Sequence, residues 1–113
     1  MSLKTQNQER AACVMENIEI LKKSDYSEKI ASYILTNGLL PTLAFLKEKE
    51  KEKEKSSYRI ICKHLKNKGM VLNETDALKE LAECDSNKLR LATREALELA
   101  NWIRRLVKSE SEE

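Results

Sequence analysis

The sequence is poor in the residues that build sheets and tight turns. Of its 113 residues, two are glycine and one is proline, and aromatic residues make up 4%. Sheet proteins use glycine and proline in their turns and aromatic or β-branched residues in their strands. The composition therefore predicts an all-α fold, and the length has room for one domain that covers residues 1–113.

Features that would place the chain in or across a membrane are also missing. No stretch resembles a signal peptide, and none approaches the ~20 apolar residues that a membrane span needs. The three cysteines, Cys13, Cys62 and Cys84, are odd in number and widely spaced. We therefore expect a cytoplasmic protein with reduced thiols and no membrane contact.

Histidine is nearly absent, which leaves little material for catalysis. The single histidine, His64, has no second histidine or carboxylate pair at metal-ligand spacing, so we expect no metal and no cofactor. Gly38 and Gly69 look like helix stops rather than parts of a phosphate-binding loop. Cys62 lies on an apolar stripe, where a thiol is buried and inert. The sequence predicts a protein that is not an enzyme.

Apolar periodicity predicts about six helices, three of them in the first half of the chain. The first runs from Leu3 to Lys23, and Asp25 with Glu28 is spaced as a capping pair that opens the second. Asn37-Gly38 ends the second helix, and Pro41 stands in the first turn of the third. The residues expected to face inward are Ala11, Val14, Met15, Ile18 and Leu21, then Ile30, Tyr33 and Ile34, then Leu40, Leu43, Ala44 and Leu46.

A strict alternation of lysine and glutamate covers residues 47–55. It places opposite charges at i,i+3 and like charges at i,i+4, so the two effects largely cancel on a helix. We interpret it as a solvated helical extension or linker, with contact to a charged partner as the alternative. A fourth helix follows, then a short fifth helix capped by Asn73, and residues 110–113 form an acidic tail. The expected inner residues are Tyr58, Ile61, Cys62 and Leu65, then Ala77, Leu78 and Leu81.

The sixth and longest helix, from Asp85 or Ser86 to about Ser109, has two opposite faces. At 100° per residue its apolar residues fall in one sector and its basic residues in the sector nearly opposite, while Glu95 and Glu98 fall at the margin. We expect this helix to be central to the packing. The apolar sector holds Leu89, Ala92, Ala96, Leu99, Ala100, Ile103, Leu106 and Val107. The opposite sector holds Arg90, Arg94, Asn101, Arg104, Arg105 and Lys108, interrupted by Leu97.

A second basic face lies on the fourth helix, where residues 55–70 contain no acid. Arg59, Lys63 and Lys66 share one side of it. Like charges gathered on one face repel one another, so an anionic partner is their natural complement, and two such faces fit a phosphate backbone although the net charge is only +2. Neither face carries aromatic residues that would stack on bases. The alternative is that these long side chains are solvated and cover the edge of the core.

Trp102 lies between the apolar and basic sectors of the last helix, on the side of Leu91. A tryptophan at the rim of a core is commonly a half-buried core residue. The alternative is a protein-contact site made by Trp102 and Leu91, a role in which tryptophan is enriched.

Two segments resemble the small helical subunit of the type III-B (Cmr) CRISPR effector complex. They are ILTNGLLPTLAFL at residues 34–46 and ATREALELANWIRRLV at residues 92–107. The resemblance implies a bundle of about six helices without enzymatic activity. Several copies would stack along a filament of larger subunits and line the groove where target RNA pairs with the guide. Arg94, Arg104 and Arg105 lie inside a matching segment, as does Asn37-Gly38.

Two other functions stay open. One is a protein-only helical scaffold or oligomerisation module whose basic faces meet acidic partner surfaces. The other is a ribonuclease of the HEPN type, because Arg59 and His64 fit the Arg-x4-His spacing of that all-helical family. Ile60 follows the arginine where that family usually has a polar residue.

Overall fold

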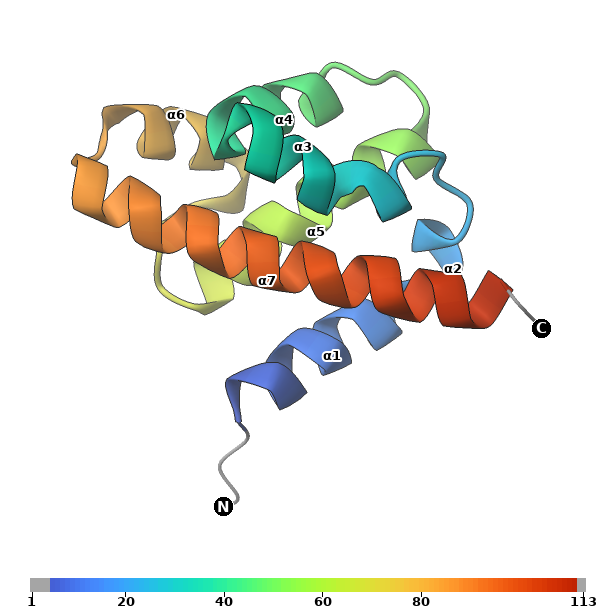
Figure 1. Cartoon of the computed structure of the whole chain (residues 1–113). Coiled ribbons are helices and arrows are strands. Elements are labelled where there is room, and N and C mark those ends of the chain that lie inside the picture. Colours follow the sequence, from blue (N-terminus) through green and yellow to red (C-terminus); the bar gives the residue numbers. More distant parts are fainter. Residues whose placement is uncertain (1–4, 112–113) are drawn as a thin grey trace.

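Helices account for all the regular secondary structure of residues 5–111, which are the residues that the computed structural model describes (Figure 1). The all-α fold class is therefore confirmed. The start of the predicted first helix at Leu3 and the last residues of the predicted acidic tail lie outside the described residues. In chain order the elements are α1 (Gln6–Glu16), α2 (Ile18–Leu21), the 3-10 helix η1 (Ser27–Lys29), α3 (Ile30–Asn37), α4 (Leu39–Lys47), α5 (Glu52–Asn67), the 3-10 helix η2 (Glu74–Asp76), α6 (Ala77–Glu83) and α7 (Ser86–Ser111).

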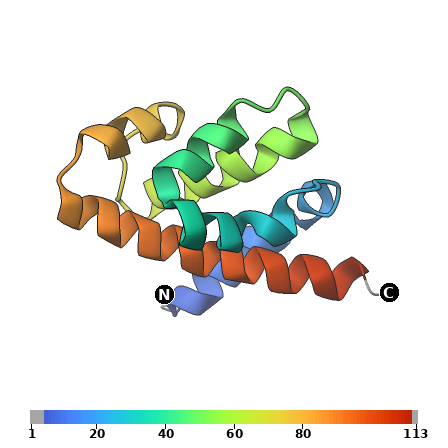
Figure 2. The ribbon, with the colours of Figure 1, turned by 45° about the horizontal axis from the view of Figure 1, so that its top comes forward.

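The last helix, α7, is about 39 Å long and organises the packing. It crosses the whole molecule, with α1 on one side of it and α3 on the other (Figures 1 and 2). The predicted apolar sector faces inward, and three of its residues, Ala92, Ala96 and Ala100, are fully buried. Their small side chains let neighbouring helices approach the α7 backbone closely. The predicted central role of this helix is confirmed.

The predicted first helix is two helices, because the backbone leaves the helical conformation at Asn17 (φ −116°, ψ 11°). The Asn17 side chain there donates a hydrogen bond to the carbonyl of Cys13 at 2.8 Å. Val14, Ile18 and Leu21 are buried, as predicted. Met15 is 51% exposed, so the prediction that it faces inward is wrong. The reason is that α1 is a short helix and presents only a narrow stripe of residues to its neighbours.

Asp25 does not cap the next helix, which corrects a second prediction. The chain turns through η1 before α3 begins, and the Asp25 N–H donates instead to the Glu54 carboxylate at 3.1 Å. Glu54, 6% exposed, also accepts a hydrogen bond from the Ser24 hydroxyl. This carboxylate therefore ties the turn after α2 to the start of α5.

The turn between α3 and α4 depends on Gly38. Its backbone conformation (φ 90°, ψ 169°) lies in a region that is essentially open only to glycine. Asn37 before it ends α3 with no special conformation of its own, and Pro41 stands in the first turn of α4 as predicted. The sharp turn brings α3 and α4 together as neighbouring helices.

Replacing Gly38 with alanine or with asparagine is expected to lower the free energy of unfolding by about 1–3 kcal/mol in each case. Asparagine tolerates the left-handed helical region but not this one, so it should not rescue the turn. The matched control is Asn37→Ala, which should change stability by less than about 0.5 kcal/mol. Urea unfolding of the three variants measures the difference, and equal stability of Gly38→Ala and the unchanged protein would contradict the assignment.

The lysine and glutamate alternation at residues 47–55 divides between a turn and a helix. α4 ends at Lys47, residues 48–51 form the connection, and α5 begins at Glu52. The segment is less solvated than expected, since Glu54 is buried and the Lys49 ammonium lies 3.8 Å from the centre of the Phe45 ring. On α4 the predicted inner residue Ala44 is exposed, because the buried side of this helix faces away from it.

The starts of the last helices follow their predicted caps. The Asn73 side chain accepts a hydrogen bond from the Thr75 N–H at the start of η2, which leads directly into α6. The Asp85 carboxylate accepts one from the Lys88 N–H at 2.8 Å and caps α7. Local side-chain chemistry therefore determines both helix starts.

Candidate nucleic-acid interface

Cationic and amide side chains gather on the outward side of α7, interrupted by Leu97. We call it the α7 basic face. Every member is exposed, in agreement with the helical spacing of the sequence. The residues of the α7 basic face are Arg90, Arg94, Asn101, Arg104, Arg105 and Lys108.

The arginines of the α7 basic face are not neutralised by any carboxylate in the part of the chain that the structure describes. Among residues 5–111, none of the four forms an ion pair with a carboxylate. Arg90 has a long contact of 3.5 Å to the Asn87 side chain, and the Arg105 guanidinium lies 5.8 Å from the centre of the Trp102 ring. A shallow depression of about 230 Å³ lies between Asn101, Arg104, Arg105 and Lys108. The four arginines of the face therefore present hydrogen-bond donors and a positive charge that no carboxylate of residues 5–111 compensates.

Glu95, an acid of α7, lies off this face on the inner side of the helix. Glu95, 5% exposed, accepts two hydrogen bonds from the Arg10 guanidinium, at 2.8 and 2.7 Å, and one from His64 Nε2 at 2.8 Å. Arg10 and His64 are themselves buried. Glu98 lies 3.8 Å from the same guanidinium, whose other donors bind Asn7 and Gln6. This buried network joins α1, α5 and α7.

The hydrogen bonds of the network hold Glu95 ionised. Burial alone would raise the pKa of this carboxyl, but the hydrogen bonds from Arg10 and His64 outweigh burial and lower its pKa to about 2. The hydrogen bond from Glu95 likewise raises the pKa of the Arg10 guanidinium against the effect of burial. Both partners are therefore charged in the folded protein.

The sequence analysis did not predict this network, because it placed Glu95 only at the margin between the apolar and basic sectors of α7. One signal was present: at 100° per residue Glu95 falls between Leu106 and Trp102 on α7, at the edge of the apolar sector. Its partners lie 85 and 31 residues away in the chain, so only the folded topology identifies them.

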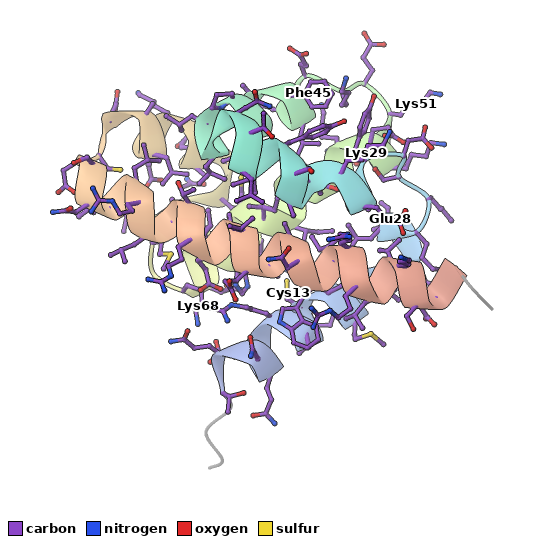
Figure 3. The ribbon with its side chains drawn as sticks, viewed as in Figure 1. Cys13, Glu28, Lys29, Phe45, Lys51 and Lys68 are labelled. Carbon is purple, nitrogen blue, oxygen red and sulfur yellow. The ribbon has the colours of Figure 1, made fainter. Side chains whose placement is uncertain are left out.

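The second predicted basic face, on α5, is weaker and points elsewhere. Lys63 and Lys66 are exposed, but Arg59 pairs with Glu52 through both of its terminal nitrogens, one at 2.7 Å. Lys68, labelled in Figure 3 and placed just after α5, pairs with Glu9 of α1. His64 points from α5 toward α7, and Arg59, Lys63 and Lys66 lie roughly 100–160° around α5 from His64. These three residues, which we call the α5 group, therefore face away from the contact with Glu95 and lie on a different helix from the α7 basic face.

A scan against known families matches residues 6–110 to a model described as "CRISPR-associated protein (Cas_Cmr5)". The match covers nearly the whole chain. The chain belongs to the Cmr5 family. The resemblance found in residues 34–46 and 92–107 is therefore confirmed, and the protein is a small subunit of the type III-B (Cmr) effector complex.

The fold agrees with a solved Cmr5 family structure. The chain is similar to the crystal structure of a CRISPR-associated Cmr5 family protein from Thermus thermophilus, with a TM-score of 0.78 and 20% sequence identity. The similarity covers 95% of this chain and 97% of the Thermus chain. The two proteins therefore share the helical architecture from end to end.

The geometry of this Cmr5 protein does not support the HEPN-type ribonuclease. His64 is 3% exposed and bonded to Glu95, whereas Arg59 is exposed and bonded to Glu52. The two side chains lie about 140° apart around α5, so they do not meet in one open cleft. Cys62 is buried as predicted, and burial raises the pKa of its thiol to about 11.

Metal ligands and membrane-spanning segments are both missing from the part of the chain that the structure describes. Within residues 5–111 there is no cluster of three or more histidine, cysteine or acidic side chains arranged to hold a metal ion. Over the same residues, no helix combines the length and apolar character needed to cross a membrane.

The predicted protein-contact residues, Trp102 and Leu91, lie in different surroundings. Trp102 is half-buried beside α1, where its indole N–H donates to the Asn7 side chain at 3.3 Å. Leu91 is 58% exposed and lines a groove of about 380 Å³ together with Leu72, which is 88% exposed. Exposed leucines of this size are better contact candidates than Trp102, which already packs within the molecule.

Proposed function

We propose that this Cmr5 subunit has no catalytic role and binds the phosphate backbone of the guide–target RNA duplex through its α7 basic face. The observation that carries the proposal is the set of exposed arginines that pair with no carboxylate of residues 5–111, while Glu95 on the inner side of the same helix is buried in the Arg10 network. Such arginines gain binding energy from the counterions that they release on contact with phosphates.

The dimensions and chemistry of the face fit backbone binding. From Arg90 to Lys108 it extends about 27 Å along one straight helix, so several phosphates can be contacted together. Guanidinium groups bind phosphates through paired hydrogen bonds. An A-form duplex is bound through its shape and backbone, while base pairing with the guide supplies sequence specificity. Cleavage in this proposal belongs to other subunits.

The proposal gives the α5 group a lesser role. Arg59 is paired with Glu52, and Lys63 and Lys66 lie on a separate helix from the α7 basic face. We therefore assign the α5 group to general electrostatic attraction or to a neighbouring RNA segment.

Protein contacts complete the proposed role. The groove lined by Leu72 and Leu91 is the proposed contact to a larger subunit or to another copy of this chain, which would stabilise the filament in antiviral defence in the cytoplasm. The same exposed leucines favour the second candidate function, a scaffold that contacts protein only. The two candidates differ in whether the arginines of α7 bind RNA.

The salt dependence of RNA binding tests the proposal. In the assembled complex, Arg94→Ala with Arg104→Ala is expected to reduce the slope of log affinity against log salt concentration by about 2, since each arginine neutralises one phosphate. The matched control is Lys63→Ala with Lys66→Ala, which removes the same charge from α5 and should change the slope by less. Equal slopes for the α7 variant and the unchanged complex would favour the scaffold.

A further inference from the structure

A second surface, on α3 and α4, carries the aromatic residues that the α7 basic face lacks. A groove of about 250 Å³ runs between the two helices. Tyr33 and Asn37 on α3 are four residues apart, as are Pro41 and Phe45 on α4, so each pair lies on one side of its helix. No residue of α3 is charged, and α4 has no charge before Lys47, so the walls are neutral. The lining residues are Tyr33, Asn37, Pro41, Thr42 and Phe45.

The rings at this groove are only half-buried and pack edge to face. The centres of Tyr33 and Phe45 are 5.7 Å apart, and those of Tyr26 and Phe45 are 5.3 Å apart. Three of the five aromatic residues of the chain are therefore gathered at one place. Their accessible ring surfaces suit a flat aromatic ligand, because stacking on them does not depend on the identity of the ligand ring.

Positive potential is present at both ends of the groove. At one end the Lys49 ammonium lies 3.8 Å from the centre of Phe45 and 5.0 Å from that of Tyr26. At the other end α4 begins at Gly38 without a side-chain cap, so the positive end of its dipole is uncompensated. The exposed Asn37 amide, which can donate and accept, lines the groove next to Gly38.

Nearby acids do not line the groove. Glu28, Glu48 and Glu50 are exposed and lie outside it. Figure 3 shows Phe45, Lys29 and Lys51 at the same end of the molecule, with Glu28 below them.

We propose that this groove binds an unpaired nucleotide of RNA. The base packs against Tyr33 and Phe45, Asn37 bonds its edge, and Lys49 and the start of α4 attract the flanking phosphates. Unpaired bases are commonly bound in this way, by aromatic stacking next to positive charge. An apolar protein side chain would use the rings but would make no use of the Asn37 amide. The proposal goes beyond duplex binding by α7 and does not depend on it.

Backbone amide NMR shifts of the isotope-labelled full chain test the proposal with small probes. Adenosine 5′-monophosphate at millimolar concentration is expected to shift the amides of residues 33–45 in a saturable manner. Adenosine should shift the same amides with an affinity a few-fold weaker, and ribose 5-phosphate, which has no base, should not reproduce the shifts. No saturable shift in residues 33–45 with the nucleotide would overturn the proposal.

Two other results would also overturn it, and they separate it from the proposed function. Stronger binding of N-acetyl-leucinamide than of adenosine would identify the groove as a pocket for a protein side chain. Amide shifts confined to α7 on addition of the nucleotide would show that the α7 basic face binds RNA and that the groove between α3 and α4 does not bind a base.

Variants of Tyr33 distinguish stacking from general apolar contact. Tyr33 is half-exposed, so Tyr33→Leu and Tyr33→Phe should both fold, which the NMR spectrum itself reports. Tyr33→Leu is expected to weaken nucleotide binding roughly tenfold, while Tyr33→Phe retains it, because only the phenyl ring preserves the stacking surface. Arg94→Ala is the control on the other surface and should leave groove binding unchanged. Unaltered nucleotide affinity in Tyr33→Leu would contradict stacking.

Discussion

Replacing Glu95 with glutamine is expected to destabilise the protein by about 3–5 kcal/mol. The change removes the negative charge but keeps the size of the side chain. It leaves the buried Arg10 guanidinium without its counter-charge, and it turns an amide toward the donors of Arg10 and His64. A buried charge that loses its partner cannot recover its hydration in the folded state.

Urea unfolding at pH 7, followed by far-ultraviolet circular dichroism, measures this loss. The control is Glu98→Gln, which removes a half-exposed carboxylate 3.8 Å from the same guanidinium and should cost less than about 1 kcal/mol. The dependence on urea concentration should stay the same, since the surface exposed on unfolding is unchanged. A loss below about 1 kcal/mol for Glu95→Gln would show that the network is not important for stability.

The stability of the protein in acid should depend on the protonation of the Glu95 carboxylate. Burial opposes its ionisation, but the hydrogen bonds from Arg10 and His64 lower its pKa in the folded state to about 2, below the ordinary 4.5. The stabilisation is therefore complete above about pH 4.5 and is lost as the pH falls toward 2. Between these two pH values the Glu95 carboxyl is protonated in the unfolded chain but still ionised in the folded protein. The stability advantage over Glu95→Gln should shrink by about 3 kcal/mol across this range. A constant advantage would contradict the lowered pKa.

Reversing the charges of α7 should have the largest effect on function. In the assembled complex, the triple change of Arg90, Arg94 and Arg104 to glutamate is expected to weaken target-RNA binding roughly 100-fold or more at moderate salt. Each substitution removes a phosphate contact and adds a repulsive charge. The three side chains are exposed and form no ion pair within residues 5–111, so folding should be little affected.

The α5 group supplies a control with the same change of charge. The triple change of Arg59, Lys63 and Lys66 to glutamate alters the net charge equally but on a different helix. It should weaken binding several-fold at most, through long-range attraction that added salt suppresses. Circular dichroism checks that both variants fold. Equal effects of the two triple variants would mean that overall charge, and not the α7 basic face, determines RNA affinity.

The sequence predicted the features that depend on local spacing. The 3.6-residue period persists along α7, so its buried side and its basic side were both predicted correctly. Caps such as Asn73 and Asp85 act within three residues and were also visible. Features that need contacts between distant segments were not. The burial of Glu95 and Glu54, and the exposure of Met15, depend on which helices become neighbours.

The candidate site shows the same division. Helical geometry was enough to gather Arg90, Arg94 and Arg104 on one face. It could not show that Glu52 neutralises Arg59. The aromatic groove was missed because Tyr33 and Phe45 come from separate helices and meet only after the turn at Gly38.

Site-specific photo-crosslinking tests the central claim most directly. Asn101 on α7 and Asn67 at the end of α5 are both exposed amides, and each can carry a benzoylphenylalanine in the assembled complex. If the α7 basic face lies on the RNA duplex, irradiation should crosslink RNA at position 101 and give little RNA adduct at position 67. RNA adducts at position 67 alone, or only protein adducts at position 101, would contradict the account.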